Sequence, residues 1–109
     1  MTLEERSQAF AARAAELCQS LPDEIQGTPP LEELVRSATG VARHVAEAAG
    51  VDAESARNAY DLATRETVRS QYWLELLNET EFISNEVFEE VHEYCVAILD
   101  ELMRRQRGA

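Results

Sequence analysis

The chain has 109 residues, 21 acidic and 10 basic, and its formal net charge of −11 argues against binding to the phosphate backbone of a nucleic acid. Glycine and proline are few, at four and three residues, which favours helices over sheets in a single domain of this size. No apolar run approaches the roughly 20 residues of a membrane-spanning helix, and the acidic N-terminus is unlike a secretion signal, so we expect a cytoplasmic protein.

The first helix is predicted over residues 3–20. Thr2 and Glu5 form the pattern of a capping box at its start. The apolar residues of one helical face follow at spacings of three, four and seven: Leu3, Phe10, Ala14, Leu17 and Leu21. Pro22 ends this helix and begins the longest connection, which extends to Pro30.

The second helix is predicted over residues 30–49. It begins after Thr28 with two prolines, and proline in the first turn of a helix loses no needed hydrogen bond. Its apolar stripe comprises Leu31, Leu34, Val35, Ala38, Val41, Ala42, Val45 and Ala49. Gly50 is predicted to end the helix and Asp52 to cap the next one, so these two helices should be antiparallel neighbours.

The third and fourth helices are predicted over residues 53–78 and 85–107, with Ser84 as the cap of the fourth. The seam of the third comprises Ala56, Tyr60, Ala63, Thr67, Ser70, Leu74 and Leu77, and that of the fourth Phe88, Val91, Cys95, Ile98 and Leu102. Four amphipathic helices joined by short loops can bury their faces together only as a bundle. We therefore predict one all-α domain over residues 1–109, an antiparallel up-and-down four-helix bundle.

The third helix has more apolar surface than one core can bury. On a helical wheel Tyr72 and Leu76 point almost opposite to its seam, and Leu62 and Trp73 lie between, so the apolar arc is roughly 240° wide. We predict that these four residues form an interface between copies of the chain. The alternative is that loops or the ends of neighbouring helices cover them.

The predicted interface also includes two small residues of the second helix. Ser37 and Gly40 are predicted to lie off the core stripe of their helix. Small side chains at such positions would let another chain approach closely. The predicted interface therefore comprises Leu62, Tyr72, Trp73, Leu76, Ser37 and Gly40.

The sequence predicts no catalytic residue, metal site or cofactor. Helical bundles that hold two metals use a Glu-x-x-His pair on each of two helices, and here Glu89 and His92 form one pair whereas His44 and Glu47 run in the reverse order. No arginine stands four to six residues before either histidine, as a helical nuclease would need, and no glycine-rich phosphate loop occurs. We therefore expect a non-catalytic protein.

The remaining candidate groups are two cysteines and three arginines. Cys18 and Cys95 fall on apolar stripes, which predicts buried thiols rather than a disulfide or a metal pair. Arg104, Arg105 and Arg107 follow a stretch, residues 71–101, with nine acidic side chains and no basic one. We interpret these arginines as complements of the helix dipole, and the alternative is a tail that binds nucleic acid.

Two blocks of the sequence resemble a bacterial four-helix-bundle family named from proteins encoded in intervening sequences of 23S ribosomal RNA genes. The first block, Leu34 to Ala48, agrees with the family motif at Arg36, Ala38, Val45, Ala46 and Glu47. It departs from the motif at His44, where asparagine is usual, and at Ala48, where glycine is usual. The second block, Glu66 to Ser84, resembles the end of the family's third helix and the turn into the fourth.

The resemblance implies an up-and-down bundle that assembles into a ring-shaped pentamer. A related branch, the accessory variability proteins of diversity-generating retroelements, binds a reverse transcriptase and nucleic acid through strongly basic surfaces. The net charge of −11 departs from that chemistry. We therefore expect a non-catalytic, self-associating scaffold, a pentamer by resemblance, that binds an unidentified protein partner; an accessory role with nucleic acid or a reverse transcriptase is the alternative.

Overall fold

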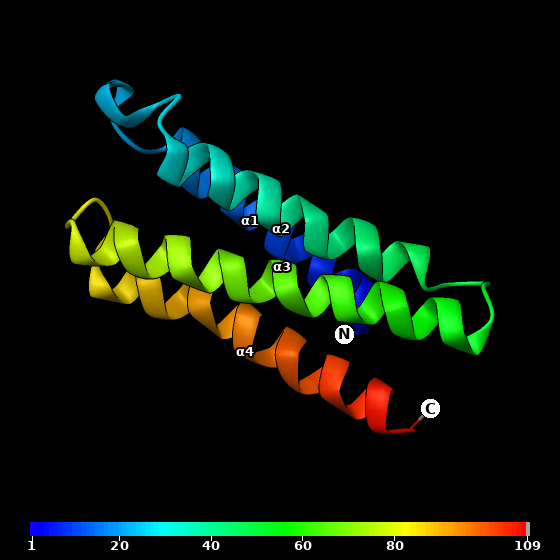
Figure 1. Cartoon of the computed structure of the whole chain (residues 1–109). Helices are drawn as coiled ribbons and strands as arrows, with labels where there is room; N and C mark the ends of the chain where they lie inside the picture. The colour runs from blue at the N-terminus through cyan, green and yellow to red at the C-terminus, as the bar shows by residue number, and fades with distance from the viewer. Residues whose placement is uncertain (109) are drawn as a thin grey trace.

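The computed structural model describes residues 1–108 and confirms the predicted all-α bundle. Its four helices are α1 (Leu3–Gln19), α2 (Pro29–Glu47), α3 (Ala53–Glu79) and α4 (Asn85–Gly108), with a short 3-10 helix, η1 (Asp23–Ile25), in the longest connection. Successive helices run in opposite directions, so both ends of the chain lie at the same end of the bundle (Figure 1). No helix among the described residues is long and apolar enough to cross a membrane.

Side chains cap three of the four helices as the sequence predicts. At α1 the Thr2 hydroxyl accepts the Glu5 amide at 3.1 Å and the Glu5 carboxylate accepts the Thr2 amide at 2.9 Å, which completes the capping box. Asp52 and Ser84 accept amides of the first turns of α3 and α4. Thr28 precedes α2, but its hydroxyl donates to a carbonyl of η1 instead.

The turn between α2 and α3 depends on a glycine. Helix α2 ends at Glu47, two residues earlier than predicted, and Gly50 follows with a φ of +76°. This left-handed conformation is costly for a residue with a Cβ atom. It reverses the chain within a few residues, so α2 and α3 pack side by side along their length (Figure 1).

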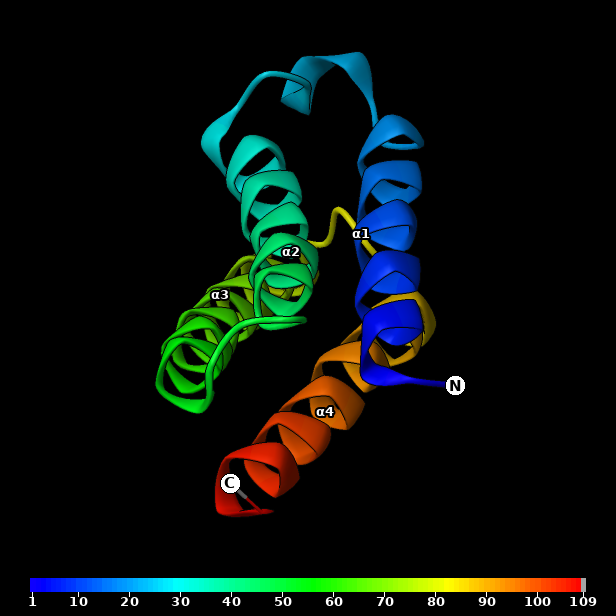
Figure 2. The same cartoon turned by 90° about the vertical axis from the view of Figure 1, so that its right-hand side faces the viewer.

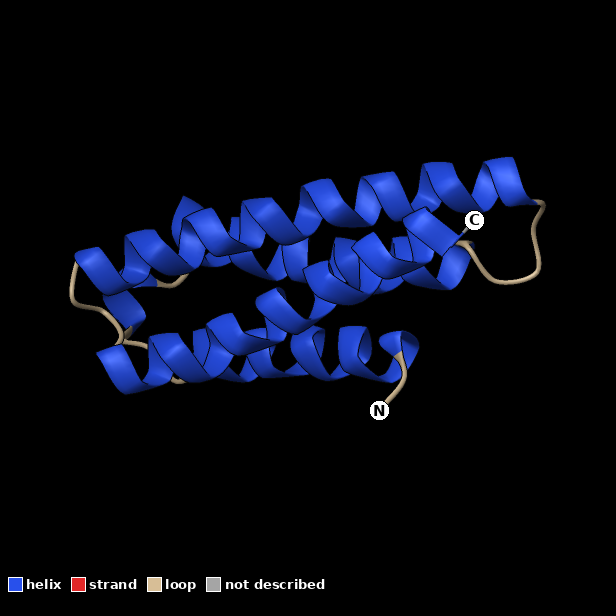
Figure 3. Cartoon of the chain, turned by 90° about the horizontal axis from the view of Figure 1, so that it is seen from below, coloured by secondary structure: helices blue, strands red, loops and turns tan. Residues whose placement is uncertain are grey.

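The core receives large side chains from every helix. Phe10, Leu34, Leu74 and Ile98 come from α1 to α4 respectively and are 0% exposed. Each helix packs against its two neighbours around the bundle, α1 on α2, α2 on α3, α3 on α4 and α4 back on α1. Figures 2 and 3 show this arrangement from the side and from below, with α4 running obliquely to α1.

Candidate interaction surface

The outer side of α3 is the part of the predicted interface that the bundle leaves accessible. Tyr72 is 58% exposed and Leu62 42% exposed, whereas Trp73 and Leu76 are half-buried. Leucine is more often buried than exposed and tyrosine is intermediate, so the informative feature is the grouping of several large apolar side chains on one surface. No loop or helix end within residues 1–108 therefore encloses Tyr72, and the surplus apolar surface expected from the sequence is present.

Tyr72 and Trp73 form a compact aromatic pair. Their rings meet edge to face, with centroids 4.9 Å apart and planes inclined by 78°. The Trp73 side chain also packs against the core, so it anchors the pair to the bundle. Leu76 lies one turn beyond Tyr72 on the same side of the helix. We call Tyr72, Trp73 and Leu76 the aromatic cluster.

Leu62 lies apart from the aromatic cluster. The side chains of Arg65 and Arg69, which are 68% and 67% exposed, stand between them on the outer side of α3. Leu62 instead lines a shallow hollow with Val51 and Ala59, near the turn between α2 and α3. The predicted apolar surface is thus divided by two arginines rather than continuous.

Ser37 and Gly40 correct the sequence interpretation, because they face α3 of the same chain. Ser37 is 3% exposed and Gly40 is buried. The Ser37 hydroxyl lies 2.8 Å from the Ser70 hydroxyl, and a Cβ atom at Gly40 would lie 2.7 Å from Glu66 Oε2. The small residues do allow close approach, but the helix that approaches is α3. Both residues are therefore buried within a single chain.

The two histidines occupy unrelated positions. His92 Nε2 lies 3.2 Å from the Gln71 side-chain nitrogen, and its ring stacks on Phe88 with centroids 5.0 Å apart. His44 Nδ1 lies 2.7 Å from the Glu47 carboxylate. Within residues 1–108 no three His, Cys, Asp or Glu side chains are grouped so that they could hold a metal ion.

Both cysteines are buried free thiols, as predicted. Cys18 lies 3.8 Å from the Leu31 carbonyl, and Cys95 is 0% exposed on the core side of α4. Burial raises the pKa of Cys18 to about 11 and that of Cys95 to about 12, because the thiolate is poorly solvated there. Neither thiol is activated as a nucleophile.

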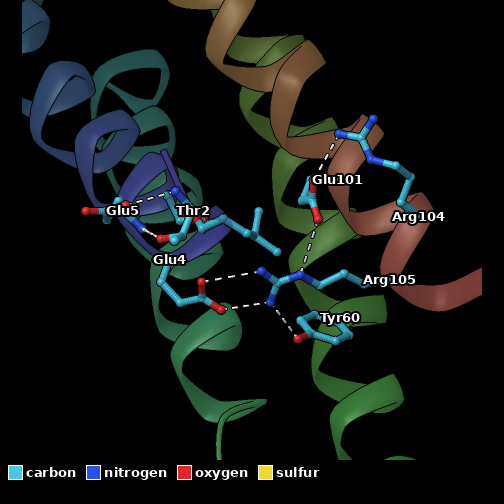
Figure 4. A network of polar contacts seen from close by, with 9 residues as sticks. Thr2, Glu4, Glu5, Tyr60, Glu101, Arg104 and Arg105 are labelled. Carbon is cyan, nitrogen blue, oxygen red and sulfur yellow. Dashed lines mark hydrogen bonds and ion pairs between the residues drawn. The ribbon is translucent and has the colours of Figure 1, made fainter. Parts of the chain in front are cut away.

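Two of the three C-terminal arginines are engaged within the bundle (Figure 4). Arg105 Nη1 donates to Glu4 at 2.8 Å and to the Tyr60 hydroxyl at 3.0 Å, and its Nε donates to Glu101 at 3.4 Å. Arg104 donates to the same Glu101 carboxylate at 2.9 Å. The hydrogen bond that Arg105 donates and Glu4 accepts lowers the pKa of Glu4 and raises the pKa of Arg105.

This network joins three helices, α1, α3 and α4, at the end of the bundle where the chain begins and ends. The sequence predicts only that these arginines complement the helix dipole. The structure shows that Arg105 also has partners on two other helices. No local pattern could have revealed them, because Glu4 and Arg105 are separated by almost the whole chain.

Among solved structures, one that matches both the fold and most of the chain comes from a bacterial protein. It is the crystal structure of a protein of unknown function from the S23 ribosomal protein family of Bacteroides thetaiotaomicron. The two proteins are 26% identical and superpose with a TM-score of 0.90, over 96% of this chain and 98% of the other. No protein-family model matches the chain, and the curated proteins contain no significant match to it.

Proposed function

We propose that the chain is a non-catalytic protein that associates with copies of itself through the outer side of α3. The single observation that carries this proposal is the aromatic cluster, in which Tyr72 is 58% exposed beside the anchored Trp73. Tyrosine and tryptophan are enriched among the residues that contribute most to binding at protein interfaces. When a second copy covers this pair, apolar surface is removed from water, which favours association.

We also propose that the chain belongs to the family of its structural neighbour and assembles into a closed ring. A TM-score of 0.90 over nearly the whole of both chains supports common descent. The motif resemblance in α2 and α3 supports the family of intervening-sequence proteins and, with it, a pentamer. A ring of five requires a heterologous interface, in which the aromatic cluster of one copy meets a different face of the next.

The area that such a ring would bury is compatible with the size of the chain. A standard interface buries roughly 800 Å² on each partner, so two interfaces would cover roughly 1,600 Å² of each copy. The isolated chain exposes 6346 Å². About a quarter of that surface would be covered, so the aromatic cluster is the centre of the proposed interface and not the whole of it.

Light scattering coupled to size-exclusion chromatography tests the proposal. The chain has a mass of 12.2 kDa, and we expect a species of several times that mass. Tyr72→Glu and Leu76→Glu should each dissociate it while circular dichroism shows unchanged helicity. Ala12→Glu is the matched control, because it adds the same charge at an exposed position on α1. A wild-type protein that is monomeric at tens of micromolar would refute self-association.

The alternative role, as an accessory to nucleic acid or a reverse transcriptase, has weaker support. Arg104 and Arg105 already pair with carboxylates of their own chain. The net charge of −11 opposes any approach to a phosphate backbone. Absence of a mobility shift with RNA and DNA at low salt would dispose of direct nucleic-acid binding.

A further inference from the structure

Helix α4 carries a second apolar stripe beside the one that enters the core. Its core stripe, Val91, Cys95, Ile98 and Leu102, is 0% exposed. Each of these core residues is followed directly by a residue of the second stripe: His92, Val96, Leu99 and Met103. These four residues are spaced four, three and four positions apart. Val96 is 45% exposed and Met103 51% exposed, whereas His92 and Leu99 are half-buried. We call these four residues the α4 stripe.

The α4 stripe lies on the side of α4 that adjoins α3. The contact of 3.2 Å between His92 and Gln71 fixes this orientation. Val68 precedes Gln71 by one helical turn on α3 and is 52% exposed. Helices α3 and α4 run side by side over this region (Figure 1). The α4 stripe and Val68 therefore form an apolar strip along the outside of the α3–α4 pair.

The charges beside the α4 stripe are mostly acidic, and Arg65 and Arg69, which adjoin Val68 on α3, pair with Asp61 and Glu66 of the same helix. Residues 71–101 contain nine acidic side chains and no arginine or lysine. Seven of these acidic residues are exposed and form no ion pair with any residue between 1 and 108: Glu75, Glu79, Glu81, Glu86, Glu89, Glu93 and Asp100. Like charges close together on a surface repel, and a cationic partner relieves that repulsion.

We propose that this strip is the docking site for a basic amphipathic helix of another protein. A partner helix with apolar residues at positions i, i+4, i+7 and i+11 matches the spacing of the α4 stripe. Lysine or arginine beside those positions would face the unpaired carboxylates. From His92 to Met103 the stripe covers roughly 16 Å, about three turns, so a helix of about 12 residues or more would span it.

Charge complementarity favours a different protein over a second copy at this site. Another copy carries the same net charge of −11. It has only ten basic residues, all arginine, and five of them already pair with carboxylates of their own chain. The α4 stripe lies on a different helix from the aromatic cluster, and Val68, one turn before Tyr72 on α3, borders that cluster. The charge argument itself does not depend on the proposed self-association.

Binding of a synthetic peptide to the purified full chain, measured by isothermal titration calorimetry, tests the inference. The probe is an 18-residue peptide of leucine and lysine with leucine at the matching helical spacing. The control peptide has the same composition in an order that destroys the amphipathic pattern. We expect the patterned peptide to bind about tenfold or more tightly than the control, since only the patterned peptide can bury its leucines on the strip.

Val96→Glu separates apolar docking from attraction by charge alone. A further negative charge strengthens purely electrostatic binding of a cationic peptide, whereas it disrupts an apolar contact. We therefore expect Val96→Glu to weaken binding of the patterned peptide about tenfold, and Ala12→Glu, on the outside of α1, to leave it unchanged. Circular dichroism of both variants would check that the bundle remains folded.

Three results would overturn the inference. Equal binding of the two peptides would show that charge alone attracts them. Unchanged or tighter binding to Val96→Glu would show that the strip is not the contact. Loss of self-association in Val96→Glu would place a second copy on the strip. Leu76→Glu distinguishes the two proposals, because Leu76 lies about two turns from Val68, so this variant should abolish self-association and leave binding of the patterned peptide intact.

Discussion

Replacement of Gly40 by alanine would measure how closely α2 and α3 approach each other. A Cβ atom there would lie 2.7 Å from Glu66 Oε2, closer than real contacts allow, and 3.1 Å from Glu66 Cγ, tighter than nine in ten real contacts. Alanine in a helix interior is favoured over glycine by roughly 1 kcal/mol. Two effects oppose this gain. The new methyl group would displace Glu66, which pairs with Arg69, and overpacking costs roughly 1–3 kcal/mol. We expect Gly40→Ala to lower the free energy of unfolding by about 1 kcal/mol.

The effect of Gly40→Ala on the free energy of unfolding should change sign when the Glu66 side chain is removed. In a Glu66→Ala background the new methyl group has room, so Gly40→Ala should raise the free energy of unfolding by about 1 kcal/mol. The coupling between the two sites is then about 2 kcal/mol in a double-mutant cycle. Urea denaturation followed by circular dichroism at two protein concentrations would measure it. Full stabilisation by Gly40→Ala in the wild-type background would refute the close approach, and a coupling that changes with concentration would place Gly40 between copies instead.

Two further predictions concern the polar network and the buried thiols. Arg105→Met should lower the free energy of unfolding by about 1 kcal/mol near neutral pH, measured by urea denaturation. Because the pKa of Glu4 is lowered in the folded state, this contribution is present above its ordinary value of 4.5 and should vanish as the pH falls through the lowered pKa. The thiols, with pKa values of about 11 for Cys18 and about 12 for Cys95, should not react with a disulfide reagent at about pH 8 in the folded protein, and both should react once urea unfolds it. Rapid reaction of either thiol in the folded state would contradict its burial.

Periodicity and capping signals were sufficient to predict the bundle. The capping box at Thr2 and the caps at Asp52 and Ser84 all form, and each signal is local, because donor and acceptor lie three residues apart. The predicted helix ends differ from those observed by at most two residues. The exposure of Tyr72 was also predictable, because a helical wheel needs no knowledge of the neighbouring helices.

The positions of Ser37 and Gly40 were not predictable by the same means. An apolar stripe marks the direction of the core, but a helix in a bundle also packs against a neighbour on each side. On the side of α2 that faces α3 the contact is made by small and polar groups, including the Ser37–Ser70 hydrogen bond. A hydrophobic pattern does not reveal such a contact, because the groups that make it are small or polar. Their partners also lie on another helix, so no local sequence pattern identifies them. The Arg105 network was unpredictable for the same reason, because its hydrogen-bond acceptors, Glu4 and Tyr60, lie on α1 and α3.

The net charge of −11 implies opposite salt dependences for the two proposed surfaces. Copies of an acidic chain repel one another, and the aromatic cluster attracts by apolar burial, so screening by salt should tighten self-association. Docking of a basic helix depends on attraction between its cations and the unpaired carboxylates beside the α4 stripe. Screening by salt should therefore weaken this docking. Light scattering and peptide titration between about 50 and 500 mM sodium chloride would measure both trends. If self-association also weakened with salt, charge pairs between copies would be holding the assembly together, and the apolar account of the aromatic cluster would fail.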